Sequence, residues 1–198
     1  MVSPIKWLRR MFMRMGVLEA IRTRRSIRRF KPTPVDDKTV ELVLDAARWA
    51  PSWANTQCAR FVVIKNSQTK AKLAETLSPN NPATTAITTA PIVIVACAEL
   101  KKSGYMRGQV STNKGDWFMF DVALAMQNLT LAAHTLGLGT VHVGLFDAAK
   151  VANILNVPDG FTVVEMTPLG IPAAEGRPPQ RKELAEIVFY ESWGKAKA

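Results

Sequence analysis

The chain has 198 residues, of which 47% are hydrophobic and 21% are charged. A chain of this length buries roughly 70% of the surface that its unfolded state exposes, which is enough for one globular domain without disulfide support. Only two cysteines and two histidines occur, which excludes a disulfide-rich secreted module and argues against a zinc site. The longest apolar run, residues 90–98, has the length of a buried strand and is too short for a membrane span. We therefore expect a cytoplasmic protein without a metal site.

The net charge of +10 is concentrated at the start of the chain, where residues 1–31 carry ten Lys or Arg and a single acid, Glu19. Residues 5–15 place apolar side chains at helical spacing among these charges. This pattern predicts a basic N-terminal arm over residues 1–14, ahead of a domain at 15–198. Such an arm packs on its own protein or on a partner subunit, and contact with an anionic membrane surface is the less common alternative. No nucleic-acid-binding motif accompanies the charge, so we expect no nucleic-acid partner.

Helices and strands are expected to alternate along the rest of the chain. The apolar spacing predicts helices at 17–23, 37–50, 68–77, 117–136 and 147–155, and strands at 61–64, 91–98, 140–144, 161–169 and 187–190. Prolines 32, 34 and 51 separate the first elements, because proline does not continue a helix. The polar, glycine-containing stretch 101–115 is long enough to be a lid. This alternation indicates layered α and β structure around a sheet.

Three short segments carry residues suited to ligand binding. Residues 24–28 (RRSIR) place three guanidinium groups and a hydroxyl together, and arginine binds phosphate oxygens in a bidentate manner. Residues 50–57 (APSWANTQ) offer amides that donate and accept at once, as the edge of a planar heterocycle requires. In the glycine-rich stretch 137–144 the backbone can approach a ligand closely. Each segment alone also has a structural explanation without a ligand. Residues 24–28 could form a solvated surface, residues 50–57 an ordinary turn, and residues 137–144 a common strand end.

Together and in this order, the segments resemble the FMN-dependent nitroreductase family. The resemblance runs from about residue 17 to residue 193. It depends on RRSIRRF (24–30), APSWANTQ (50–57), DVALAMQNLTLAAHTLGLGTVHVGLFD (121–147) and PLGIPAAEGRPPQRK (168–182). It implies an α+β fold with a central mixed sheet flanked by helices. It also implies a homodimer that binds two FMN molecules at the subunit interface.

The resemblance also implies site residues. The cofactor-binding set is Arg24, Arg25, Ser26, Arg28, Pro51, Ser52, Asn55, Gln57, Val143, Gly144 and Arg181. In this set the arginines and Ser26 hold the phosphate and ribityl chain, with Arg28 reaching toward the pyrimidine end of the ring. Pro51 and Ser52 are expected to meet the flavin of the other subunit. Cys58-Ala59 and Pro179 depart from the Pro-Trp and Lys that some relatives carry at these places.

The implied activity is reduction of nitroaromatic, quinone or related small acceptors, with NADH or NADPH as the electron donor. We expect a ping-pong reaction in which the flavin N5 accepts hydride, so no side chain is assigned a catalytic role. Trp53, Tyr105 and Trp117 are expected to shape the acceptor pocket, and packing of the tryptophans at the dimer interface is the alternative. A flavin-binding protein without turnover and a flavin-fragmenting or dehalogenating enzyme remain as other possibilities.

Overall fold

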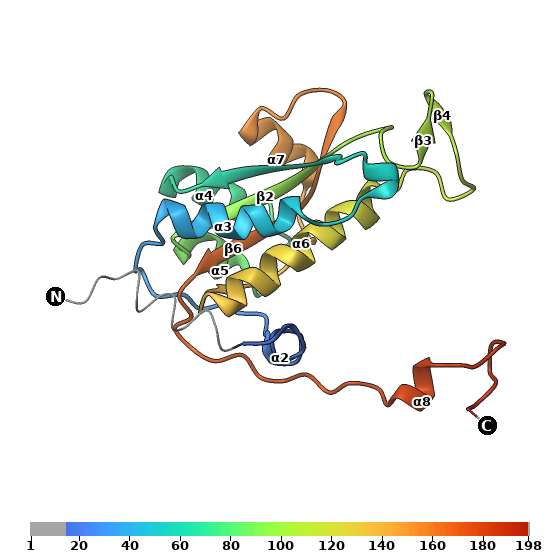
Figure 1. The fold of residues 1–198 in the computed structure, drawn as a ribbon. Coiled ribbons are helices and arrows are strands. Elements are labelled where there is room, and N and C mark those ends of the chain that lie inside the picture. The colour runs from blue at the N-terminus through green and yellow to red at the C-terminus, as the bar shows by residue number, and fades with distance from the viewer. Residues whose placement is uncertain (1–14, 198) are drawn as a thin grey trace.

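The computed structural model describes residues 15–197, so the predicted basic arm at 1–14 lies outside the described residues. At its centre is a four-stranded sheet in the order β1-β2-β6-β5 (Figure 1). The strands are β1 (Ala59–Ile64), β2 (Ile92–Glu99), β5 (Gly139–Thr140) and β6 (Phe161–Gly170), with a separate hairpin of β3 (Tyr105–Met106) and β4 (Gln109–Val110). The helices are α2 (Val17–Thr23), α3 (Asp37–Arg48), α4 (Ser67–Ala74), α5 (Thr84–Thr89), α6 (Phe118–Thr135), α7 (Ala148–Leu155) and α8 (Leu184–Ile187). The architecture is α+β, as predicted.

Strand β2 lies at the centre of the fold because both of its faces are covered. All of its side chains from Ile92 to Ala98 are buried. Alternate side chains of a strand point to opposite faces of the sheet. The even-numbered positions pack in one core with residues of α3 and α6, and the odd-numbered positions pack in a second core with residues of α4, α5 and α7. The uninterrupted apolar run 90–98 therefore reflects a strand with helices on both sides.

Helix α6 confirms the long apolar helix predicted over residues 117–136. It covers Phe118–Thr135 and packs beside α3 on one face of the sheet (Figure 1). Its buried side chains include Met126 and Leu129, which are inaccessible to solvent. Of the helices within residues 15–197, none combines the length and apolar character needed to cross a membrane.

Two predicted strands differ from the structure. Strand β5 covers only Gly139–Thr140, and Val143 pairs with Met166 through an isolated bridge instead of extending the strand. The prediction of a strand over 187–190 is wrong, because α8 occupies Leu184–Ile187 and no strand of residues 15–197 pairs with the apolar residues after it. Helix α8 begins with a reciprocal capping box between Glu183 and Glu186, which favours a helical turn at this place.

The arginine-rich segment 24–28 is attached to the edge of the sheet. Ser26 forms a parallel bridge with Thr140, and the Ile27 N–H donates to the Thr140 carbonyl oxygen at 2.8 Å. The ladders between the four named strands are antiparallel, so the parallel pairing expected of a mixed sheet is limited here to this isolated bridge. Gly139 permits the approach, because a Cβ at this position would lie 2.7 Å from the Ile27 Cβ. The backbone of the segment is therefore fixed by the sheet.

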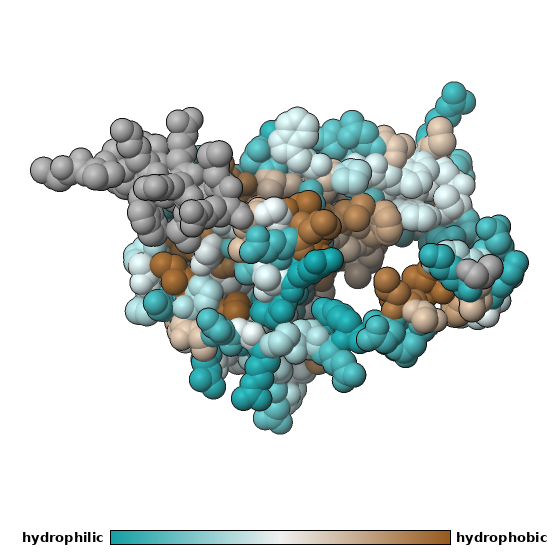
Figure 2. Space-filling model, turned by 60° about the horizontal axis from the view of Figure 1, so that its bottom comes forward, coloured by the Kyte–Doolittle hydropathy of each residue, from teal (hydrophilic) through white to brown (hydrophobic). Residues whose placement is uncertain are grey.

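The C-terminal segment leaves the body of the molecule and carries α8 away from the sheet (Figure 1). Its apolar side chains are exposed, with Leu184 at 73% and Trp193 at 91% of their accessible surface. Figure 2 shows hydrophobic side chains on this segment as well as on the nearby surface of the body. Large apolar patches of this kind typically mark an interaction surface.

Gly139→Ala is expected to destabilise the protein, because the new methyl group forces Ile27 away from the sheet edge. Overpacking of this type costs about 1–3 kcal/mol, which lowers the midpoint of urea unfolding. Gly144→Ala is the matched control, since a Cβ there meets nothing within 4 Å. Equal unfolding midpoints for the two variants would contradict the proposed role of Gly139.

Candidate functional site

The first part of the candidate site is a cavity of about 730 Å³ beside the sheet edge. Six arginines and a single carboxylate, that of Glu175, line it, and we call it the arginine cavity. The arginines are Arg24, Arg25, Arg28, Arg29, Arg177 and Arg181, and Ser26 also lines the cavity. The structure thus brings together all the residues predicted to hold a phosphate. Arg29 and Arg177 were not predicted, although RRF and EGR in the sequence could have indicated them.

Arg24 is a half-buried member of this group. Its Nη1 atom is buried and is the one side-chain nitrogen or oxygen of this kind, among the described residues, that lacks a hydrogen-bond partner. Burial lowers the pKa of Arg24, and the positive charges of Arg25 and Arg181 lower it further. An unpaired buried cation is costly unless an anion neutralises it. The arrangement therefore fits a bound anion with several oxygen acceptors.

Arg25 is held from two sides. Its Nη1 donates to the carbonyl oxygens of Arg22 at 2.7 Å and Arg24 at 2.9 Å. Gly176 lies against its side chain so closely that a Cβ at Gly176 would be 2.4 Å from the Arg25 Cβ. The glycine of EGR is therefore required by the packing of segment 24–28 against residues 174–177. This contact joins two segments that are far apart in the sequence.

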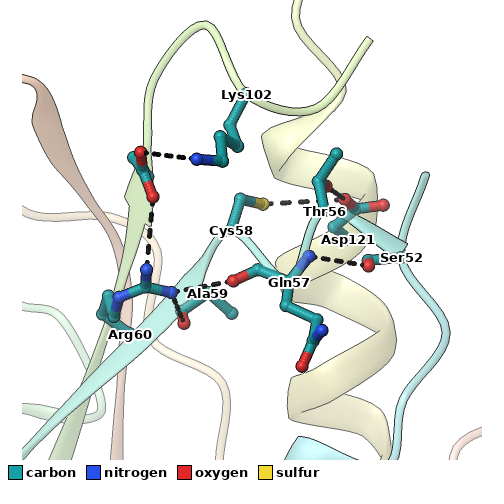
Figure 3. A network of polar contacts seen from close by, with 9 residues as sticks. Ser52, Thr56, Gln57, Cys58, Ala59, Arg60, Lys102 and Asp121 are labelled. Atoms are coloured by element: carbon teal, nitrogen blue, oxygen red, sulfur yellow. Dashed lines mark hydrogen bonds and ion pairs between the residues drawn. The ribbon is translucent and has the colours of Figure 1, made fainter. Parts of the chain in front are cut away.

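The second part of the candidate site is the loop of residues 52–58, which we call the amide loop. Three non-glycine residues in it have left-handed backbone conformations: Ala54 at φ 45°, Asn55 at φ 55° and Gln57 at φ 50°. Such conformations are unfavourable for residues with a Cβ and persist only when the surroundings enforce them. The Gln57 N–H donates to Ser52 Oγ at 2.9 Å, which closes the loop (Figure 3).

Asp121 of α6 holds the amide loop by accepting hydrogen bonds from it. Its role was not predicted from the sequence. It is 2% exposed, and its Oδ1 accepts a hydrogen bond from the Trp53 N–H at 2.9 Å. Its Oδ2 accepts from Ser103 Oγ at 2.7 Å. It also accepts more weakly from Cys58 Sγ at 3.6 Å (Figure 3). The sequence signal for this role was that Asp121 is the single carboxylate in the predicted helix 117–136.

Cys58 is an unreactive thiol in this environment. Burial, followed by the charge and hydrogen bond of Asp121, raises the pKa of Cys58 to about 12. A cysteine nucleophile needs the thiolate form, so Cys58 contributes packing and a weak hydrogen bond. Among residues 15–197 there is also no cluster of three or more His, Cys, Asp or Glu side chains that could hold a metal ion.

A second cavity of about 730 Å³ lies beside the amide loop. Pro51, Ser52 and Gln57 line it, together with Arg60 and Lys102, which both bond to Glu99 at 3.2 Å. None of its lining residues also lines the arginine cavity. Within a single chain, the two parts of the predicted site therefore occupy separate cavities.

The remaining predicted residues lie outside both cavities. The Val143 N–H is already bonded to the Met166 carbonyl oxygen at 2.9 Å, so the exposed Gly144 is better placed to offer its backbone to a ligand. Trp117 donates from Nε1 to Thr112 Oγ1 at 2.8 Å and packs edge-to-face on Phe120. The others, Asn55, Trp53 and Tyr105, lie on the amide loop and on strand β3. For Trp117 the structure thus favours packing over an acceptor pocket.

Comparisons with known proteins identify the family. The model of the Nitroreductase family matches residues 21–86 and 78–171. A protein of Methanothermobacter thermautotrophicus, provisionally named NADH dehydrogenase/NAD(P)H nitroreductase, is 31% identical over 186 residues, which cover 91% of this chain and 89% of the relative. The FMN reductase (NAD(P)H) of Bacillus subtilis is 25% identical over 188 residues, covering 89% of this chain and 74% of the relative.

Solved structures agree with these sequence matches. The crystal structure of a nitroreductase family protein from Clostridium novyi is 30% identical, with a TM-score of 0.71, and the match covers 92% of this chain and 97% of that chain. The agreement confirms both the fold class and the resemblance that the sequence motifs indicated. The chain belongs to the nitroreductase family.

Proposed function

We propose that this chain is an FMN-dependent oxidoreductase, which takes electrons from NADH or NADPH and reduces nitroaromatic, quinone or related small acceptors. The observation that carries the proposal is the buried, unpartnered Nη1 of Arg24, a residue that lines a cavity with five other arginines, namely Arg25, Arg28, Arg29, Arg177 and Arg181. Membership in a family that includes an FMN reductase and an NAD(P)H nitroreductase supports the same assignment.

The donor set fits the phosphate of FMN. A phosphate monoester carries a charge of about −1.5 to −2 near pH 7 and three acceptor oxygens. Guanidinium groups bind such oxygens through paired, charge-assisted hydrogen bonds. Arg24, Arg25 and Arg181 would hold the phosphate, with the hydroxyl of Ser26 as a further donor. Neutralisation of Arg24 by this anion would remove the cost of its burial.

The protein would bind and orient the cofactor while the flavin supplies the hydride chemistry. Arg28 lies in the same short segment and lines the same cavity. Its positive charge would stabilise negative charge on the pyrimidine side of the ring. The exposed amides of Asn55 and Gln57 would bond to the ring edge, because they can donate and accept hydrogen bonds simultaneously.

The separation of the two cavities supports a homodimer. In a dimer with two-fold symmetry, each chain would place its amide loop next to the arginine cavity of its partner. The exposed apolar side chains of the C-terminal segment, among them Leu184, Ile187 and Trp193, would be covered in such an assembly. Each complete site would then contain residues of both subunits.

Purified protein loaded with FMN tests the proposed activity. In the absence of oxygen, NADH or NADPH is expected to bleach the visible flavin absorbance, and a quinone or nitroaromatic acceptor is expected to restore it. Protein that binds FMN but never bleaches would be a flavin-binding protein without turnover. Loss of FMN itself during the reaction would instead favour the flavin-fragmenting alternative.

Arg24→Met is expected to weaken FMN binding by roughly 10- to 100-fold, since it removes charge-assisted hydrogen bonds to the phosphate. The same substitution should leave the ligand-free protein equally stable or more stable, because a half-buried guanidinium with an unpartnered Nη1 is lost. Fluorescence titration with FMN and urea unfolding measure the two effects.

Arg22→Met is the control for this substitution, because it removes the same charge from an exposed position two residues away. It is expected to change FMN affinity by less than about threefold, as surface charges are screened by solvent. If both variants bind FMN like the wild type, the arginine cavity does not hold the phosphate.

A further inference from the structure

Asp121 receives hydrogen bonds from two different loops. Its donors are the Trp53 N–H, Thr56 Oγ1 and Cys58 Sγ of the amide loop, and Ser103 Oγ of the segment 101–117. Among the ion pairs of the described residues, none includes Asp121. Within the described part of the chain, the hydrogen-bond donors to this carboxylate are therefore neutral groups, and they belong to the amide loop and to the segment 101–117.

Stability alone gives little reason for a carboxylate at this position. Desolvation of a buried charge is expensive, and an apolar side chain of similar volume often stabilises a protein as well or better. The neighbouring α6 residues Val122, Ala125 and Met126 are apolar and buried. What distinguishes Asp121 from them is its ability to accept several hydrogen bonds at once.

The amide loop needs such an anchor because its backbone is unfavourable. Ala54, Asn55 and Gln57 all have positive φ, and none of them is a glycine. Trp53 immediately precedes this stretch, and its N–H is fixed to Asp121. At the other end of the stretch, Cys58 is buried and directed at the same carboxylate. Both ends of the left-handed stretch are thus tied to one side chain, and Figure 3 shows the contact at the Cys58 end.

The segment 101–117 is tied to the same side chain. Ser103 is fully buried and donates to Asp121, while its carbonyl oxygen accepts from the Trp117 N–H at 3.1 Å. Asp116 closes the base of this segment by accepting from the Lys101 N–H at 2.6 Å. Beyond this closed base, the hairpin of β3 and β4 projects from the body (Figure 1). The base of the segment and the amide loop are therefore both hydrogen-bonded to the Asp121 carboxylate.

We propose that Asp121 is a positioning residue, which holds the amide loop in its left-handed conformation and couples it to the base of the segment 101–117. This inference rests on the proposed function, because it assigns Asp121 the task of presenting Asn55 and Gln57 to the flavin ring. Asp121 does not itself touch the cofactor in this account.

Asp121→Leu tests the proposal. Leucine is compatible with the apolar neighbours of this position, but it lacks both acceptor oxygens of the carboxylate. We expect the visible circular dichroism of bound FMN to change, because this signal reports the surroundings of the ring. We also expect kcat/KM for a quinone acceptor to fall by about 10- to 100-fold, as small displacements of positioning groups do. Asp121→Asn should restore much of both signals, because its amide oxygen still accepts from Trp53 and its NH2 can donate to Ser103.

Thr130→Val is the matched control on the same helix. Thr130 is fully buried and donates only to the Gln127 carbonyl oxygen, away from both loops. This variant is expected to lower thermal stability without altering the circular dichroism of bound FMN. If Asp121→Leu does not fold, Ser103→Ala, which removes a single donor, is expected to shift the flavin signal in the same direction by a smaller amount.

The outcomes separate the inference from the proposed function. Wild-type protein that takes up no FMN would overturn both. Wild-type protein that binds and reduces FMN, with Asp121→Leu or Ser103→Ala showing the flavin spectrum of Thr130→Val, would overturn the positioning role alone. A flavin spectrum altered by Asp121→Leu and recovered by Asp121→Asn would support it.

Discussion

The burial of β2 on both faces is the constraint on which the rest of the structure depends. Its alternating side chains belong to two separate cores, and each core requires its own layer of helices. Strand β6 pairs with β2 and carries the short strand β5 on its other side. The edge at β5 then receives the segment 24–28 through the Ile27 and Thr140 backbone contact. The end of the site proposed to bind the phosphate is thus positioned by the sheet itself.

The other end of the site depends on α6. This helix forms one wall of the first core, and its first turn carries Asp121. Packing of the helix therefore fixes the position of the carboxylate, and the carboxylate fixes the amide loop. The arginine cavity, at one end of the site, has an excess of positive charge. The amide loop, at the other end, is held by hydrogen bonds from neutral groups to Asp121. The first arrangement suits a phosphate, and the second suits the edge of a polar ring.

Much of this organisation could be predicted from the sequence. The run 90–98 indicates β2 because it is short and rich in β-branched residues, and the apolar residues of 117–136 indicate α6 because the segment is too long for a strand. The arginines of 24–28 are adjacent in the sequence, so their clustering required no knowledge of the fold. The motifs of residues 24–30, 50–57 and 121–147 also indicated the family correctly.

The features that escaped prediction depend on contacts between distant residues. Local preference opposes left-handed backbone at Ala54, and the loop around it is held by hydrogen bonds that Asp121, far along the chain, accepts. The apolar residues 187–190 read as a strand, but a strand needs a neighbour to pair with, and none lies beside them. The separation of the two cavities also became visible only in three dimensions.

The central claim is that two chains combine their half-sites to form each complete site. Mixed dimers with Arg24→Met in one subunit and Asn55→Gly in the other test it most directly. Because one of the two sites in such a dimer contains only intact residues, turnover of NAD(P)H and quinone should recover to roughly half of the wild-type value. Activity no higher than the mean of the two variant homodimers would contradict the claim, since it would show that each chain completes its own site.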